Sequence, residues 1–288
     1  MTPGEAGSLM LGTAGTRALL IGSGAFVPSS GLDDVPAVAA TIADLGRCLV
    51  ERAGLDPGHL TSLIDPASPQ EMGDALVSAA RQADEALLVH YVGHGLVSDR
   101  NELHLATRRA TLTMDRGLPE HQALPYTALY QALSECAAPL IVVILDCCFA
   151  GRAQKVISSA TADTPAGMYL LTSTDGRRHA WAPPGGRYTA FTGALIELLT
   201  RGDPVAPRLL TLDDVYRSLS RTLTDRGYPQ PHRHAVDFTD RQHLAPNPAH
   251  GLGAPGTRVG SSAPIGDWPP SARRTPGSSS AGSGSPTP

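Results

Sequence analysis

Leu140-Ile-Val-Val-Ile-Leu-Asp-Cys-Cys148 is the stretch that decides the fold, because an unbroken apolar run ending in polar residues is typical of a strand buried on both faces. A second such run, Ala86-Leu-Leu-Val-His-Tyr-Val92, ends in Gly93-His94-Gly95. A thiol and an imidazole, each displayed at the carboxyl end of a buried strand, are the two groups that a thiol hydrolase requires. The sequence therefore predicts a cysteine peptidase.

The apolar patterns around these two runs alternate between strand and helix along the chain. Strands are predicted at Arg17–Gly22, His59–Ile64, Ala86–Val92, Leu140–Leu145 and Met168–Ser173, with a small one at Glu102–Ala106. Helices are predicted at Val35–Arg52, Ser68–Gln82, Tyr126–Cys136, Phe191–Leu199 and Leu212–Leu223. The alternation favours a three-layer α/β/α sandwich around a mostly parallel, six-stranded sheet. Reactive groups in such sheets collect at the carboxyl ends of the strands, so His94 and Cys148 are expected to face each other.

Composition predicts one folded domain with flexible ends. Residues 245–288 contain 9 Pro, 8 Gly and 8 Ser in 44 positions, a mixture that buries too little apolar surface to offset its ordering entropy. We expect a flexible N-terminus over 1–16, a peptidase domain over 17–244 and a disordered tail over 245–288. The central region is long enough to bury a single large core.

Charge and cysteine content limit the possible partners and the compartment. A net charge of −4 and the lack of a basic cluster argue against nucleic-acid and membrane-surface binding, which leaves a protein or peptide partner. The chain has four cysteines, two of them adjacent, and starts without a basic secretory segment. This pattern does not fit a disulfide framework, and we expect a reducing, cytoplasmic location.

The chemistry expected at the sheet edge is nucleophilic attack by a thiolate. An ordinary thiol is mostly protonated at neutral pH, and an adjacent imidazole can accept its proton. His94 would then serve as base and acid, and the amides of Gly95 and Cys148 are candidate oxyanion donors. Alternation places one of Cys147 and Cys148 in the core and the other in the cleft, and the residues alone leave that choice open. A strained vicinal disulfide between them would instead form a redox couple.

Metal binding is a further alternative, because His90 and His94 are four residues apart. On a strand that spacing spans roughly 13 Å, which is too far for one ion to be held by both rings. No Cys-x-x-Cys pair is present. We predict no metal site and no cofactor, and leave a calcium requirement open.

Four motifs resemble the caspase-like cysteine peptidases, and within them the metacaspase and bacterial caspase-like branch, especially effector-associated domains of actinobacteria. The resemblance extends from about Arg17 to Pro248. Its motifs are Arg17-Ala-Leu-Leu-Ile-Gly22, Val89-His-Tyr-Val-Gly-His-Gly95, Ile144-Leu-Asp-Cys-Cys-Phe-Ala-Gly151 and Tyr188-Thr-Ala-Phe-Thr-Gly193.

The resemblance implies a role for each site residue. Cys148 matches the nucleophile and His94 the base, which leaves Cys147 to core packing. Asp146 matches the acid that binds a basic substrate side chain, so cleavage after Arg or Lys is implied. The chain departs from the family pattern at Phe149-Ala150, where His-Ser is usual, and at Ala40-Thr41, where metacaspases carry Asn-Asp.

Members of the resembled family are often cut in the segment that follows the nucleophile, which here contains Arg152 and Lys155. Self-processing at one of these residues is one hypothesis, and an ordinary solvated loop is the other. Two other functions compete with peptidase activity. One is a catalytically silent caspase-like module that recruits signalling proteins, and the other is a redox-controlled binding protein that uses the Cys147-Cys148 pair. Retention of both His94 and Cys148 favours the hydrolase.

Overall fold

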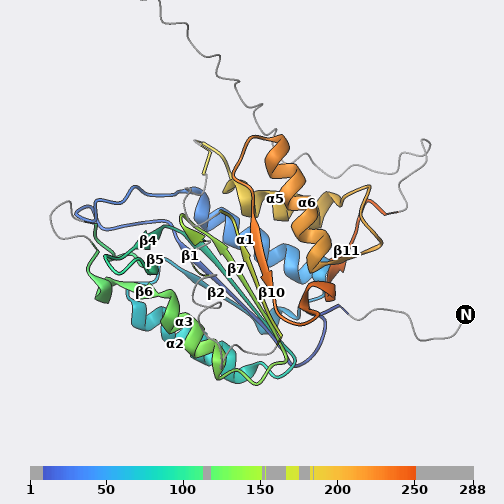
Figure 1. Ribbon diagram of the computed structural model, residues 1–288, viewed down its shortest axis with the longest axis horizontal. Coiled ribbons are helices and arrows are strands. Elements are labelled where there is room, and N and C mark those ends of the chain that lie inside the picture. Colours follow the sequence, from blue (N-terminus) through green and yellow to red (C-terminus); the bar gives the residue numbers. More distant parts are fainter. Residues whose placement is uncertain are drawn as a thin grey trace, which may run out of the picture. The chain divides into compact units, whose positions relative to one another are not determined.

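The computed structural model describes residues 9–112, 118–150, 153, 167–174, 182–183 and 185–250, all within one compact unit, Met1–Gly256. At its centre lies a six-stranded sheet in the order β10-β8-β7-β3-β1-β2 (Figure 1). Its strands are β1 (Thr16–Ser23), β2 (Leu60–Ile64), β3 (Ala86–Gly93), β7 (Leu140–Asp146), β8 (Met168–Thr172) and β10 (His232–Ala235). β10 runs antiparallel to β8, whereas the other neighbouring pairs are parallel. The predicted fold class is confirmed.

Helices cover both faces of this sheet, which explains its unbroken apolar strands. On one face lie α1 (Ala37–Ala53), α5 (Ala190–Arg201) and α6 (Leu212–Asp225), and on the other α2 (Pro69–Gln82) and α3 (Tyr126–Ser134) (Figure 1). Successive strand residues point to opposite faces: Leu20 packs with α1 and α5, and Leu19 and Ile21 pack with α2 and α3. None of the helices in the described part of the chain is long and apolar enough to cross a bilayer.

Two small antiparallel sheets complete the described architecture. Between β3 and β7 the chain forms β4 (Gly95–Val97), β5 (Leu103–Ala106) and β6 (Ala123–Pro125), with the short 3₁₀ helix η2 (Glu120–Gln122) before β6. β5 is the small strand expected from the sequence. The second sheet pairs β9 (Leu209–Thr211) with β11 (His243–Pro246). The remaining 3₁₀ turns are η1 (Pro57–His59) and η4 (Thr239–Arg241).

The packed chain extends past both predicted domain boundaries. At the N-terminal end the Met10 amide donates to the His243 carbonyl at 2.9 Å, and Met10 is buried. At the other end Asn247 Nδ2 donates to the Asp203 carbonyl at 2.8 Å, beyond β11. These anchors are a few buried side chains, Met10 and Leu11 among them, and single hydrogen bonds, which are too few to produce a periodic hydropathy signal.

Candidate active site

β3 and β7 bring His94 and Cys148 to the same level of the sheet. Their parallel register pairs Val92 with Asp146, and each candidate residue lies two positions further along its own chain. Neighbouring strands lie about 4.8 Å apart. A Cβ built on Gly95 would lie 2.0 Å from the Cys148 carbonyl oxygen, so the backbones of Gly95 and Cys148 touch. The structure therefore places the residue after the predicted base against the backbone of the predicted nucleophile.

The His94 ring is held by two groups from the segment between β1 and α1. Its Nε2 lies 2.7 Å from the Asp33 carbonyl oxygen, and its ring centroid lies 5.1 Å from that of Phe26. Because a carbonyl only accepts hydrogen bonds, Nε2 carries the hydrogen. In the neutral ring Nδ1 is then unprotonated and can accept a proton from a thiol.

The main chain of His94 is fixed as well. Its carbonyl oxygen accepts hydrogen bonds from the Tyr91 hydroxyl at 2.9 Å and from the Ala106 amide at 3.1 Å. Tyr91 is fully buried, and burial raises its pKa well above the ordinary value, so the hydroxyl stays protonated and able to donate. Ring and backbone of His94 are both held by neighbours that the sequence did not single out.

The adjacent cysteines have different environments. Cys147 is fully buried and packs into the core on the α2 and α3 side. Burial raises its pKa well above the ordinary value, and it stays a thiol. Cys148 is partly exposed. The four cysteines, all of which the structure describes, form no disulfide. This placement agrees with Cys147 as core packing and Cys148 as the accessible thiol.

The chain turns sharply just after Cys148. Phe149 has φ = 59°, a left-handed conformation that is uncommon for a bulky residue and costs about 1 kcal/mol. Gly151 and the candidate processing residues, Arg152 and Lys155, lie outside the described residues.

Asp146 joins the end of β7 to the start of α5. Its side chain is buried, the residue being 2% exposed. Oδ2 accepts hydrogen bonds from the hydroxyls of Thr189 at 2.6 Å and Thr192 at 2.7 Å, and from the Thr192 amide at 3.2 Å. Burial raises the pKa of Asp146, and these hydrogen bonds offset only part of that increase. The predicted substrate-binding carboxylate thus has protein partners in the interior.

His90 extends this buried network. Its Nε2 lies 3.0 Å from Thr192 Oγ1, which donates its own hydrogen to Asp146, so His90 Nε2–H is the donor to Thr192. Complete burial lowers the pKa of His90 to about 3, and the ring is neutral. His90 and His94 therefore have separate partners. The sequence missed Thr189 and Thr192 as site residues because their carboxylate partner is 43 and 46 positions away.

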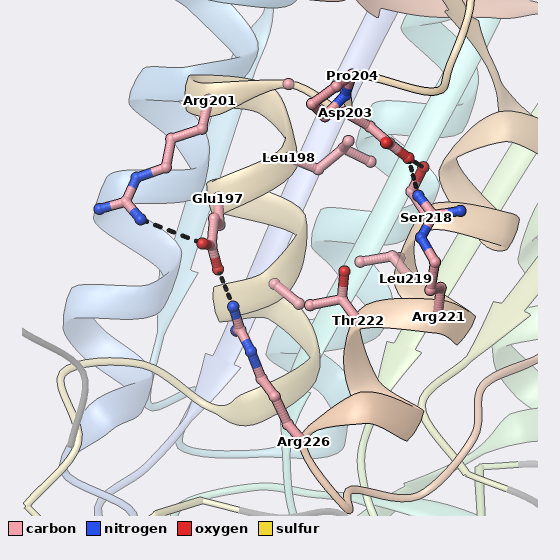
Figure 2. Close-up of a pocket in the computed structure, with 12 residues that line it drawn as sticks. Glu197, Leu198, Arg201, Asp203, Pro204, Ser218, Leu219, Arg221, Thr222 and Arg226 are labelled. Carbon is pink, nitrogen blue, oxygen red and sulfur yellow. Dashed lines mark hydrogen bonds and ion pairs between the residues drawn. The ribbon is translucent and has the colours of Figure 1, made fainter. Parts of the chain in front are cut away.

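A cavity of ≈ 200 Å³ lies between α5 and α6 (Figure 2), and neither His94 nor Cys148 lines it. Its charges satisfy one another: Glu197 pairs with Arg201 at 3.2 Å and Arg226 at 2.7 Å, and Asp203 pairs with Arg221. The cavity lies at the carboxyl end of α5, whereas Thr189 and Thr192, which bind the Asp146 carboxylate, lie at the amino end of that helix. No cysteine or histidine is among its described lining residues. The side chains around the cavity therefore link α5 to the end of α6 and its neighbouring loop, whereas the predicted base and nucleophile, His94 and Cys148, lie at the sheet edge.

Comparison with known proteins agrees with this arrangement. A family model described as the caspase domain matches residues 16–240, a span that contains all six strands of the central sheet as well as His94 and Cys148. A search of curated proteins finds no match. The chain therefore belongs to the caspase-domain family, a family of cysteine-type peptidases.

Proposed function

We propose that this chain is a cysteine endopeptidase in which Cys148 is the nucleophile and His94 the general base and acid. The proposal is carried by one observation: the bond from His94 Nε2 to the Asp33 carbonyl leaves Nδ1 as the proton acceptor, beside the backbone contact between Gly95 and Cys148. A thiolate paired with an imidazole is an activated nucleophile for acyl transfer.

The proposed reaction uses Nδ1 of His94 as base and then as acid in each of its two halves. It removes the proton from Cys148 Sγ, and the thiolate attacks the peptide carbonyl carbon to form a tetrahedral oxyanion. We assign stabilisation of that oxyanion to the amides of Gly95 and Cys148. Nδ1 then donates its proton to the leaving amine, which departs from the thioester on Cys148. Nδ1 next removes a proton from water, and the hydroxide attacks the thioester carbonyl carbon. The carbon–sulfur bond breaks, the carboxylic acid product leaves, and Nδ1 returns its proton to the Cys148 thiolate.

A preference for Arg or Lys before the scissile bond is part of the proposal, and the resemblance to metacaspases supports it through Asp146. A substrate cation that bound Oδ2 of that carboxylate would compete with the hydroxyls of Thr189 and Thr192. Membership of the metacaspase or actinobacterial effector-associated branch, a cytoplasmic location and signalling partners are proposed on the same resemblance.

The test is cleavage of fluorogenic peptides that carry Arg, Lys or Asp before the scissile bond. Wild type is expected to cleave the Arg and Lys peptides faster. Cys148→Ala should abolish turnover, and His94→Gln should reduce kcat by about 10²- to 10⁴-fold, the usual contribution of an acid–base group. Cys136→Ala and His121→Gln remove a thiol and an imidazole elsewhere on the chain and should leave turnover unchanged.

A peptidyl electrophile separates this function from its two competitors. Covalent labelling of Cys148 that is lost in His94→Gln supports the dyad. Labelling at the same rate in wild type and in His94→Gln, or peptide cleavage that survives in Cys148→Ala, would refute the proposed dyad.

Self-processing is a separate part of the proposal, because Arg152 and Lys155 follow the nucleophile and match the proposed specificity. Purified wild type should be clipped after one of them, whereas Cys148→Ala should stay intact. Clipping of both proteins at equal rates would contradict this part alone.

A further inference from the structure

The segment between β1 and α1, residues 24–36, holds the His94 ring from two directions. Its Asp33 carbonyl accepts the Nε2 hydrogen at 2.7 Å, and its Phe26 ring packs against the imidazole with centroids 5.1 Å apart. Neither contact is made by a charged side-chain group. The tautomer of His94 thus depends on where this segment places one backbone oxygen.

Asp65 anchors the base of the segment. It follows β2 directly, and its amide donates to the carbonyl of Gly22, near the end of β1, at 2.7 Å. Its Oδ1 accepts hydrogen bonds from the Gly24 amide at 2.7 Å and the Ala25 amide at 2.9 Å. Asp65 therefore bonds to the chain on both sides of the point where it leaves β1.

The backbone of Asp65 is itself in an uncommon conformation. Its φ is 49°, in the left-handed region, where Asp and Asn are more frequent than most residues other than Gly. That conformation allows the amide and the side chain of one residue to bond to β1 and to the segment together. An anchor of this form accepts Asn or Gly in place of Asp without backbone strain, which makes the role of the carboxylate separately testable.

Within the segment a second carboxylate, that of Asp34, connects the residues bound by Asp65 to Phe26 and Asp33, which contact His94. Asp34 Oδ1 accepts a hydrogen bond from the Phe26 amide at 2.8 Å, and the Val35 amide donates to the Gly24 carbonyl at 2.8 Å. These bonds close the segment on itself, so Phe26 and Asp33 keep a fixed separation. Movement at Gly24 would therefore shift both groups that hold the ring.

We propose that Asp65 is a positioning residue for His94: by binding the amides of Gly24 and Ala25 it fixes the Asp33 carbonyl, and so keeps the hydrogen of the His94 ring on Nε2. The inference rests on the proposed function insofar as that tautomer leaves Nδ1 ready to accept the thiol proton. Asp65 acts through the segment, and its role is distinct from that of the groups that meet the substrate.

The test uses Asp65→Gly, which keeps the left-handed backbone accessible and removes the acceptor, and Asp65→Asn, which keeps an oxygen acceptor. Asp56→Gly is the matched control, because Asp56 Oδ1 accepts the Gly58 amide at 2.7 Å at the start of η1. Full-length protein labelled with ¹⁵N-histidine reports the tautomer of each ring by NMR, and the His94 signal is assigned by its loss in His94→Gln.

In wild type, Asp65→Asn and Asp56→Gly the neutral His94 ring should show the Nε2–H tautomer. Asp65→Gly should show a mixture of tautomers, with kcat lowered about 10- to 100-fold and KM within about twofold, because a misplaced catalytic group loses rate without losing substrate contacts. A wild-type tautomer and kcat in Asp65→Gly would overturn the proposal, as would equal impairment in Asp65→Asn.

Two further readouts keep the result interpretable. If Asp65→Gly does not fold, Asp34→Ala opens the same segment from its exposed side, and a wild-type tautomer in that variant overturns the proposal. If Asp65→Gly shifts the tautomer while wild type cleaves no peptide, the positioning role stands and the proposed peptidase function fails.

Discussion

Gly95→Ala should inactivate the site by moving the backbone that carries the nucleophile. The new methyl carbon would lie 2.0 Å from the Cys148 carbonyl oxygen, and also 3.0 Å from its carbonyl carbon and 3.1 Å from Cys147 Sγ. Ordinary van der Waals contact begins at 3.4 Å, so the oxygen and the methyl must separate by a further 3.4 − 2.0 = 1.4 Å. Both neighbours are backbone or buried atoms, so no flexible side chain can absorb that movement.

A displacement of about 1 Å at a catalytic group can cost about 10²-fold in rate, and overpacking of this kind destabilises a protein by about 1–3 kcal/mol. We therefore expect kcat/KM to fall at least about 100-fold while the protein stays folded. Peptide cleavage gives kcat/KM, the rate of Cys148 alkylation reports the reactivity of the thiol, and urea denaturation gives the free energy of unfolding.

Gly73→Ala is the matched control, because a Cβ at Gly73 in α2 meets nothing within 4 Å. It should keep full activity and gain about 0.5–1 kcal/mol of stability from helix propensity. Gly95→Ala with wild-type cleavage and alkylation rates would refute the close approach of the Gly95 and Cys148 backbones.

Two further predictions concern the buried network behind the dyad. Thr192→Val removes the hydroxyl shared by Asp146 and His90 and should lower the free energy of unfolding, measured by urea denaturation, by about 1–3 kcal/mol. The control is Thr200→Val, whose hydroxyl bonds within its own helix and whose loss should change that free energy by less than about 0.5 kcal/mol. Similar losses in the two variants would contradict the role of the network. Burial lowers the pKa of His90 to about 3, below the roughly 6.5 of an unfolded chain. Below pH 6.5 the unfolded state therefore binds more protons, and the free energy of unfolding should fall by up to about 1.4 kcal/mol for each unit by which the pH is lowered. His90→Leu should remove this contribution between pH 6.5 and 4.5, and a pH dependence identical to that of wild type would argue against a neutral, buried ring.

The central sheet could be predicted because its parallel strands are buried on both faces and so read as apolar runs. β1, β3, β7 and β8 fall within two residues of their expected bounds. β10 has the sequence His-Arg-His-Ala and lies at the sheet edge with all four residues half-buried, so its hydropathy carries no strand signal. β4, β6, β9 and β11 are only three or four residues long, too short to show alternation.

The candidate site could be predicted as far as the positions of His94 and Cys148, because a Cys and a His at the ends of consecutive apolar runs form a local sequence pattern. The groups that hold them form none. Asp33 contributes a carbonyl, which every residue has, and Asp65 acts through backbone amides 40 and 41 positions away. Such partners become visible only when the register of the strands is known.

The backbone oxygen that accepts the His94 hydrogen has a consequence for mutational scans. A side-chain partner of the histidine would be deleted by substitution with alanine, but replacement of Asp33 by any residue leaves its carbonyl in the chain. An alanine scan of this protein would therefore delete the side chains of His94 and Cys148 but leave the third group of the proposed centre in place. The third group would be exposed only by changes that move the main chain itself, such as an insertion, a deletion or a proline in the segment that presents it.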